Sequence, residues 1–275
     1  MTTAATIPES VEASMAFVVD TGIKPVSETY GGDSTVHNYH GSYEDKPVTI
    51  RNLRAEAAEF SLDAEGFRLV EHKTKVKDFF DEDEVRNVYY PELVELVKQE
   101  TGCSRAFVFD HTRRAGDEET REKHKIRGPV STVHNDYTDW SGPQRVRDVL
   151  PDEAEELLKH RVQVIQVWRA IETPILSNPL AICDARTMSP EDFVRAERRH
   201  PDRIGEIYHI AHNPKQSWGY VPRMMRDEAL VFKCYDSRTD VSRFTAHGSF
   251  ADPNTPADAP PRKSMEARIL AFFTP

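Results

Sequence analysis

The chain has 275 residues and a formal charge of −10, from 46 acidic and 36 basic residues. This length suits one large β-rich or α/β domain, or two smaller ones. The negative charge argues against a polyanionic partner, because phosphate binding needs clustered Lys and Arg with a positive field. We therefore expect no nucleic-acid partner.

The cysteines and the N-terminal segment bear on the compartment of the protein. Cys103, Cys183 and Cys234 lie far apart and form no CxxC pair, so neither a disulfide framework nor a zinc ribbon is predicted. The segment MTTAATIPESVEASMAFVV has no basic region followed by an uninterrupted apolar stretch, and no window approaches the length needed to cross a bilayer. We expect a soluble cytoplasmic protein with no membrane partner.

The predicted elements alternate between helices with clear end signals and short strands. Gly102 is a plausible C-cap for the first helix, within which Pro91 should break or restart the chain. Ser189 and Pro190 suit the start of another helix of about ten residues. Strands are predicted where short runs are rich in β-branched and aromatic residues. In chain order the elements are a helix near 83–102, a strand at 105–112, a helix in 151–160, a strand at 161–170, a helix in 189–200, a strand at 228–237 and a final strand in 262–273.

Few helices and several short strands predict a β-sandwich or barrel with helices packed outside. The proline-rich segment 252–261 is expected to join two strands rather than two domains. In 161–170 the two glutamines, Gln163 and Gln166, fall on opposite faces, so this strand is expected to line a solvated cavity. We predict one domain over 1–275, with residues 1–44 as an N-terminal extension.

The stretch VHNDYT at 133–138 places His134 and Asp136 two positions apart. In an extended segment such side chains project to the same side, so both can bind one metal ion. A second histidine would complete the 2-His-1-carboxylate site, which leaves three metal positions open for water, oxygen and a bidentate co-substrate. An isolated HxD is also compatible with two surface polar residues, so the second histidine decides the interpretation.

Five downstream histidines are candidates for that third ligand. His160 and His200 are expected near helix ends, where an imidazolium suits the negative end of the helix dipole. His209 and His212 lie in a segment that reads as strand and turn. His247 follows a strand and precedes Gly248, which lets the backbone approach a bound ligand closely. We therefore expect His247 to be the third ligand.

Arg262 and Ser264 stand two positions apart at the start of the last predicted strand. An arginine and a serine on one strand face offer a bidentate clamp and a hydroxyl donor for a small carboxylate. A surface ion pair is the alternative role of Arg262. The order of HxD, a distant histidine and RxS favours a metal site followed by a carboxylate anchor.

With these residues in place, the chain resembles the non-haem iron oxygenases grouped with the cephamycin methoxylation protein and the fungal gibberellin desaturase and hydroxylase/desaturase proteins. The resemblance runs from about residue 45 to the C-terminus. The shared phrases are RNLR near 51, FSLDAEGFRLVEH at 60–72, FVFDHTRR at 107–114, RGPVSTVHNDYT at 127–138, VIQVWRAIETPILSNPLAICDART at 164–187, DEALVFKCYDS at 227–237 and HGSFADPNTPADAPPRKSMEARIL at 247–270.

The resemblance implies a mainly β fold with flanking helices, a double-stranded β-helix or jelly roll that holds iron between its two sheets. It implies that His134, Asp136 and His247 bind Fe(II). The chain departs from the family before Trp218, where family members often have a histidine.

In the wider superfamily an RxS arrangement binds the distal carboxylate of 2-oxoglutarate. This makes Arg262 and Ser264 the counterparts in this chain. Arg268 falls on the same strand face and is the rival anchor.

The implied reaction couples decarboxylation of 2-oxoglutarate by O2 to removal of a hydrogen atom from a small specialised metabolite, giving hydroxylation or desaturation. Two alternatives stay open. One is a non-haem iron oxidase that uses the same ligands without 2-oxoglutarate, cyclising or desaturating a small carboxylate substrate bound by Arg262. The other is an inactive jelly-roll binding protein.

Five further residues are candidate substrate contacts. Trp168 and Tyr235 are large aromatics within strands and could equally belong to the core. Arg127 precedes a Gly-Pro pair and could be a turn residue. The candidates are Arg127, Tyr137, Arg145, Trp168 and Tyr235.

Overall fold

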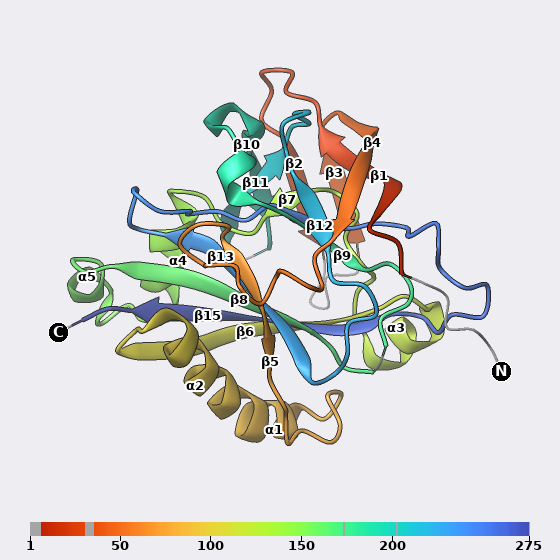
Figure 1. The fold of residues 1–275 in the computed structure, drawn as a ribbon. Helices are drawn as coiled ribbons and strands as arrows, with labels where there is room; N and C mark the ends of the chain where they lie inside the picture. The colour runs from red at the N-terminus through yellow and green to blue at the C-terminus, as the bar shows by residue number, and fades with distance from the viewer. Residues whose placement is uncertain (1–6, 31–35, 173, 202, 275) are drawn as a thin grey trace.

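The computed structural model describes residues 7–30, 36–172, 174–201 and 203–274. Its strands form two facing sheets, with helices outside (Figure 1). The larger sheet has the order β1-β4-β12-β9-β14-β7-β11-β10-β2-β3, and the smaller has the order β5-β13-β8-β15-β6. The jelly-roll fold expected from the resemblance is thus confirmed.

The strands of the larger sheet come from all parts of the chain. They are β1 (Ser10–Val18), β2 (Val26–Tyr30), β3 (Val36–His40), β4 (Tyr43–Asn52), β7 (His134–Asn135), β9 (Leu180–Cys183), β10 (Phe193–Arg199), β11 (Ile204–Ile210), β12 (Trp218–Tyr220) and β14 (His247–Ser249). Those of the smaller sheet are β5 (Phe67–Glu71), β6 (Arg105–Ala115), β8 (Val162–Ala170), β13 (Glu228–Asp236) and β15 (Lys263–Phe272).

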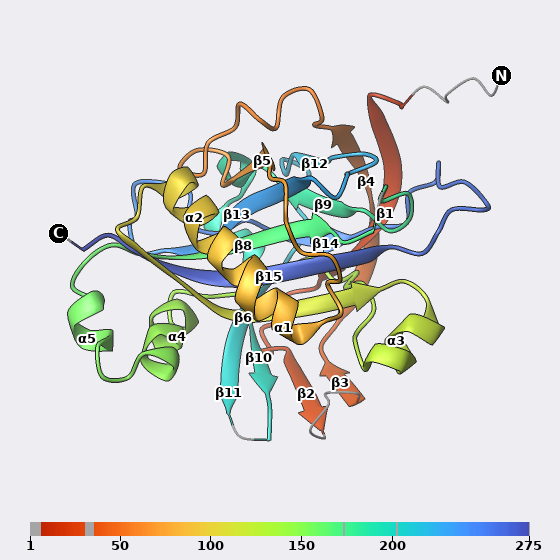
Figure 2. The ribbon, with the colours of Figure 1, turned by 90° about the horizontal axis from the view of Figure 1, so that it is seen from below.

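The helices lie at the edges of the sheets and over one face. They are α1 (Glu82–Glu84), the π-helical turn η1 (Val85–Tyr89), α2 (Tyr90–Thr101), α3 (Glu118–His124), α4 (Ser141–Val149), α5 (Ala154–Leu157) and the 3-10 turns η2 (Ala185–Thr187) and η3 (Pro190–Asp192). In Figure 2, α2 runs across the outer face of the smaller sheet. Its buried Leu93 and Val97 pack there against Ala267 and Ile269 of β15.

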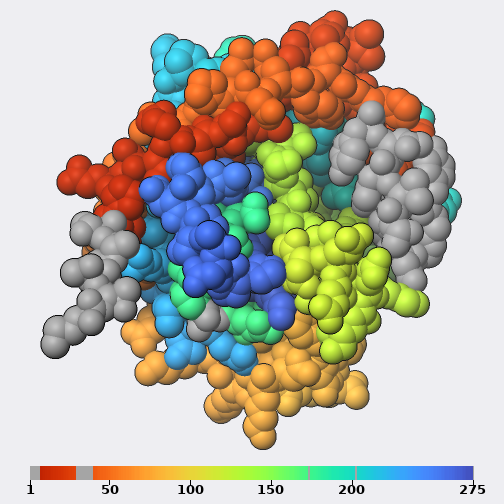
Figure 3. All heavy atoms as spheres, turned by 90° about the vertical axis from the view of Figure 1, so that its right-hand side faces the viewer, coloured from red at the N-terminus to blue at the C-terminus, as the bar shows by residue number. Residues whose placement is uncertain are grey.

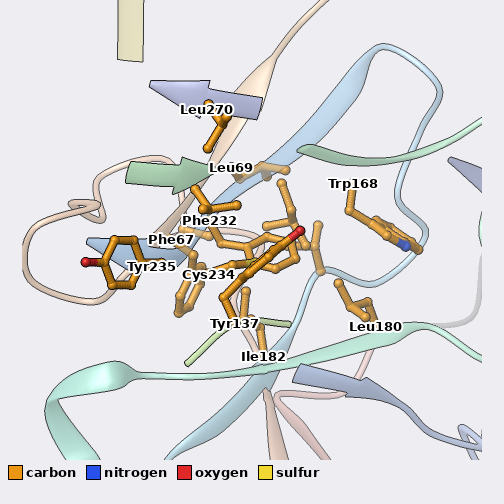
Figure 4. Close-up of a cluster of buried hydrophobic side chains, with 14 of the residues drawn as sticks. Phe67, Leu69, Tyr137, Trp168, Leu180, Ile182, Phe232, Cys234, Tyr235 and Leu270 are labelled. Carbon is orange, nitrogen blue, oxygen red and sulfur yellow. The ribbon is translucent and has the colours of Figure 1, made fainter. Parts of the chain in front are cut away.

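The core between the sheets is built from alternating strand positions. Phe232 and Cys234 of β13 and Leu270 of β15 meet Ile182 of the larger sheet, and Figure 4 shows these side chains in one cluster. Burial of such side chains stabilises the fold by about 1.5–3 kcal/mol each. All three cysteines are buried and form no disulfide, as predicted.

The four predicted strands are confirmed as β6, β8, β13 and β15. The proline-rich segment 252–261 joins β14 to β15, also as predicted. Gly102 ends α2 with φ +73° and its N–H donates to Lys98 O, which confirms the C-cap. At Pro91 the helix restarts rather than breaks, because the chain changes from π-helix to α-helix at Tyr90. In 151–160 the α-helix is limited to α5.

The helix predicted in 189–200 is wrong. The capping box of Ser189 and Asp192 is present, but it closes only the short turn η3. The chain then continues as β10, which pairs antiparallel with β11 and parallel with β2. Pairing on both sides satisfies the backbone of this segment and outweighs its helical propensity.

The expectation that strand 161–170 lines a solvated cavity is also wrong. All nine residues of β8 are buried, because the strand lies between β13 and β15. Gln163 Nε2 donates to Asp236 Oδ2 at 2.9 Å, and Gln166 Nε2 donates to Glu266 Oε2 at 3.4 Å. The side-chain amide nitrogens of both glutamines therefore donate to carboxylates within the protein rather than to solvent.

Within the described residues, no helix combines the length and the apolar character needed to cross a bilayer.

Candidate metal centre and carboxylate pocket

His134, Asp136 and His247 come together where β7 and β14 pair. The register places His247 opposite His134, and the two ring centroids are 4.6 Å apart. His134 Nε2 is 3.4 Å from Asp136 Oδ1. One ligand atom from each of the three side chains lies within 4.8 Å of the other two. Two nitrogens and one oxygen in this arrangement fit the donor set of a 2-His-1-carboxylate site.

Both imidazoles are oriented by backbone carbonyls. His134 Nδ1 is 2.8 Å from Thr132 O, and His247 Nδ1 is 3.0 Å from Thr245 O. With Nδ1–H as donor to each carbonyl, the Nε2 lone pair remains for a metal, which is the usual way that ligand histidines are held. Burial, together with the neighbouring His134, lowers the pKa of His247 to about 4, so its imidazole is neutral at pH 7. A metal ligand must be in this deprotonated form.

Asp136 is buried and ionised. Burial alone would raise the pKa of its carboxyl, but the Arg268 guanidinium and the neighbouring histidines hold the pKa well below its ordinary value. Arg268 Nε donates to Asp136 Oδ2 at 2.7 Å. The centre therefore presents an anionic oxygen beside two imidazoles.

Arg262 and Ser264 lie buried at the start of β15. Arg262 Nη1 donates to Asn178 O at 2.6 Å, and the guanidinium lies 5.5 Å from the ring centroid of Trp168. Among the described residues, Arg262 Nε and Ser264 Oγ have no hydrogen-bond partner. Burial and the charge of Arg114 lower the pKa of Arg262 to about 9. A buried cation with an unused donor beside an unused hydroxyl fits the carboxylate of a bound ligand, because unpaired buried charge is otherwise costly.

Arg268, the rival anchor, has other partners. Besides Asp136, its Nη1 donates to Asp110 Oδ2 at 3.0 Å and to Thr112 Oγ1 at 3.3 Å. Its Nη2 lies 3.3 Å from Glu266 Oε1. Protein groups thus occupy both edges of this guanidinium.

Two cavities adjoin the candidate centre. The first has a volume of about 750 Å³ and includes His134, Asp136, Ile207 and His209 in its lining. Part of the segment 118–132 belongs to this lining, and Figure 3 shows the yellow-green atoms of this region with teal atoms visible in a hollow beside them. The second, of about 530 Å³, shares Asp136 with the first.

The predicted substrate contacts are divided between cavity and core. Arg127 lines both cavities, whereas Tyr137 and Arg145 line only the 530 Å³ cavity. Trp168 and Tyr235 lie in the core cluster of Figure 4, and neither lines a cavity described above.

His200 lies between β10 and β11, not at a helix end as expected, because the segment before it is a strand. It lines the 530 Å³ cavity.

Sequence reasoning missed His209 as a neighbour of the centre. It pairs with His134 across β11 and β7, so His247, His134 and His209 form a row across three adjacent strands. Its Nδ1 is 3.0 Å from Tyr43 Oη, and burial lowers its pKa to about 3. Only the strand register reveals this row, because no sequence spacing links the three histidines.

The fold and these side chains define a jelly-roll protein with a candidate 2-His-1-carboxylate centre and a buried arginine directly before β15. A protein-family model described as "Oxidoreductase/YMDC permease-like domain" matches residues 15–272. The hydroxylase/desaturase efuI of Hormonema carpetanum is 30% identical over 98% of both chains. The hydroxylase/desaturase CTB9 of Cercospora beticola is 33% identical over 88% of this chain and 83% of its own.

A solved structure agrees with these sequence relatives. The iron and alpha-ketoglutarate-dependent endoperoxidase NvfI superposes with a TM-score of 0.86 and 27% identity, over 97% of this chain and 99% of the other. The chain belongs to this oxidoreductase family, whose named members include Fe(II)/2-oxoglutarate-dependent dioxygenases and hydroxylase/desaturases of fungi. The family resemblance is therefore confirmed.

Proposed function

We propose that the protein is a non-haem iron dioxygenase that uses 2-oxoglutarate and O2 to hydroxylate or desaturate a small specialised metabolite. His134, Asp136 and His247 hold Fe(II) in this proposal. The observation that carries it is the meeting of their three ligand atoms, with both Nδ1 atoms turned toward backbone carbonyls. The names of the relatives support the same cofactor and co-substrate.

Iron with bound 2-oxoglutarate would activate O2, which supplies the oxidising power that removes hydrogen from an unactivated carbon. The protein residues have the tasks of binding and orientation. Arg262 and Ser264 hold the distal carboxylate of 2-oxoglutarate through Arg262 Nε and Ser264 Oγ, which have no hydrogen-bond partner in the part of the chain that the structure describes. The 750 Å³ cavity beside His134 and Asp136 holds the substrate.

The remaining substrate contacts follow from the cavity linings. Arg127 contacts the substrate from the wall that the two cavities share, and Tyr137 and Arg145 act from the second cavity. Trp168 and Tyr235 act indirectly, Trp168 through its contact with the Arg262 guanidinium and Tyr235 through the core.

We further propose that residues 1–275 work as one domain in the cytoplasm, with no nucleic-acid or membrane partner. The net charge of −10 supports this proposal with respect to nucleic acid.

Metal binding tests the proposed centre. Replacing His134, Asp136 or His247 by alanine should abolish binding of Fe(II) to protein handled without oxygen, because a three-ligand site has too few ligands to lose one. His160→Ala is the control, since His160 follows α5 and is not in the ligand cluster. Full metal content in any of the three alanine variants would refute the assignment.

Succinate formation tests the reaction. The proposal predicts oxygen-dependent conversion of 2-oxoglutarate to succinate, even at a slow rate without substrate. Metal binding with no succinate under any condition would favour the oxidase that draws its electrons from the substrate. Absence of metal binding by the unaltered protein would favour an inactive binding protein.

A further inference from the structure

Arg268 contacts the candidate metal centre without belonging to the ligand cluster. Its Nε donates to Asp136 Oδ2 at 2.7 Å, whereas Asp136 Oδ1 lies 3.4 Å from His134 Nε2. The two carboxylate oxygens are thus in different environments. Oδ1 faces the histidines, and Oδ2 is held from behind by a charged hydrogen bond, the stronger kind of hydrogen bond.

Arg268 is itself fixed in place by contacts that leave it little freedom. Its Nη1 donates hydrogen bonds to Asp110 and Thr112 of the neighbouring strand β6, and Glu266 lies beside its Nη2. Glu266 Oε1 in turn accepts from Arg114 Nε at 2.9 Å and from Arg114 Nη2 at 2.6 Å. The charges therefore alternate in a buried series Arg114–Glu266–Arg268–Asp136.

This series also reaches the chain segment that leads to the metal ligands. Arg114 Nη1 donates to Gly128 O at 3.0 Å, six residues before His134 in the sequence. Arg268 thus links Asp136 to two rigid strands, and Arg114 links the same strands to the approach to β7. A guanidinium can do this because its donors point in several fixed directions at once, which an ammonium group cannot match.

We infer that Arg268 is the positioning residue of the metal centre: it holds Asp136 Oδ2 so that the carboxylate offers a metal one oxygen, Oδ1, and cannot chelate through both. This inference rests on the proposed function. A one-oxygen ligand leaves the open metal positions that a bidentate co-substrate and O2 require. The same contacts occupy donors of Arg268 that a carboxylate ligand would need, so we assign separate tasks to Arg262 and Arg268.

The test uses metal-free full-length protein titrated with Co(II) under nitrogen, because the visible absorption of Co(II) reports both affinity and coordination. Arg268→Lys keeps the positive charge but loses the planar guanidinium, whose donors point in several fixed directions. We expect it to bind Co(II) roughly 10–100-fold more weakly, as for other residues that orient metal ligands, and with an altered absorption spectrum. Arg169→Lys is the matched control and should bind Co(II) as the unaltered protein does, because Arg169 is a buried arginine of β8 that donates to the carbonyls of His72 and Arg226.

A second, milder variant tests the same contact in case Arg268→Lys does not fold. Asp110→Asn leaves Arg268 and Asp136 in place and weakens only the contact to Nη1, since the Asp110 side chain is about half exposed at 51%. It should lower Co(II) affinity less than Arg268→Lys does.

The outcomes separate the role of Arg268 from the proposed function. If the unaltered protein binds Co(II) and Arg268→Lys binds it with the same affinity and spectrum, the positioning role is wrong. The role is also wrong if Arg268→Lys changes only the 2-oxoglutarate requirement, because Arg268 would then be the anchor. If the unaltered protein binds no divalent metal, the proposed function fails, and the role of Arg268 fails with it.

Discussion

Two buried arginines six positions apart, Arg262 just before β15 and Arg268 within it, differ in whether their charge has a carboxylate partner. Arg268 has carboxylate partners at Asp136 and Asp110. Arg262 is also buried, but its guanidinium contacts a backbone carbonyl and an aromatic ring. Burial with the neighbouring Arg114 lowers the pKa of Arg262 to about 9, whereas the carboxylates around Arg268 outweigh its burial and raise its pKa well above the usual value.

This contrast predicts different effects of substitution on stability. At pH 7 the folded protein disfavours the charge on Arg262, so Arg262→Met should leave the free energy of unfolding of the ligand-free protein unchanged or higher. Arg268→Met should lower it by roughly 3–5 kcal/mol, because it leaves buried carboxylates unpaired. Urea denaturation of both variants without metal or co-substrate measures the difference.

The same Arg262→Met protein should need a much higher 2-oxoglutarate concentration. Loss of a charged hydrogen-bonding group costs roughly 1.5–3 kcal/mol, or about 10–100-fold in affinity. Titration of 2-oxoglutarate into the Fe(II) protein under nitrogen measures this. Normal 2-oxoglutarate binding by Arg262→Met would show that Arg262 is not the anchor.

At the scale of elements, one face of β15 holds both polar residues of the candidate site and apolar residues of the core. Successive inward positions are Ser264, Glu266 and Arg268 in the first half of the strand, followed by Leu270 and Phe272 in the core between the sheets. The period of two explains why RxS and the last apolar residues could be read from the sequence. The partners of Arg268 could not be predicted from the sequence, because Asp110 reaches it through the register of β6 and β15, and Asp136 comes from the segment that follows β7 of the other sheet.

Sequence patterns predict the secondary structure correctly where local residue types determine it, and they fail where pairing with distant strands determines it. The cap at Gly102 and the strands β6, β8, β13 and β15 follow from local residue types, and the structure has them. The segment 193–199 carries helical signals and is nevertheless a strand, because β2 and β11 flank it. The row formed by His247, His134 and His209 depends on register alone, so sequence spacing gives no indication of it.

The end of α2 offers a clean test of a local effect. Gly102 has φ +73°, and a Cβ there would meet no atom within 4 Å. Gly102→Ala should therefore lower the free energy of unfolding by roughly 1–2 kcal/mol, purely because an L-residue disfavours this backbone conformation. Gly205→Ala in β11 is the control, since its nearest neighbour would be at 3.8 Å and its φ is ordinary. Equal stability of the two variants would contradict this explanation.

At the scale of the whole molecule, an ion cluster around the buried Lys233 and Asp236 joins segments that are distant in the chain. Lys233 of β13 is fully buried and contacts Asp236 at 2.7 Å and Asp63 at 2.5 Å. Its Nζ also donates to Ser242 O at 3.0 Å. Arg161, just before β8, binds Asp236 at 2.7 Å and Asp63 at 2.8 Å. The cluster thus holds together the segment before β5, the start of β8 and both sides of the end of β13.

This cluster makes stability depend on pH in a defined direction. Burial raises the pKa of Asp236, but the hydrogen bond from Arg161 and the charge of Lys233 outweigh it, and the net pKa is below the usual value. A carboxyl with a lowered folded-state pKa adds stability that is fully present above its unfolded pKa, about 3.9, and is lost as the pH falls through the folded value.

Asp236→Asn should therefore lower the free energy of unfolding at pH 7 by roughly 3–5 kcal/mol, because the buried Lys233 would lose its buried carboxylate partner and keep only the more exposed Asp63. The difference from the unaltered protein should shrink below about pH 4, where the unaltered protein loses the contribution of the ionised carboxylate. Asp240→Asn is the control, because Asp240 pairs with Arg238 at an exposed position. Its replacement should change neither the free energy of unfolding at pH 7 nor its dependence on pH measurably. Urea denaturation across this pH range measures both effects, and a difference that stays constant with pH would mean that Asp236 does not act through its charge.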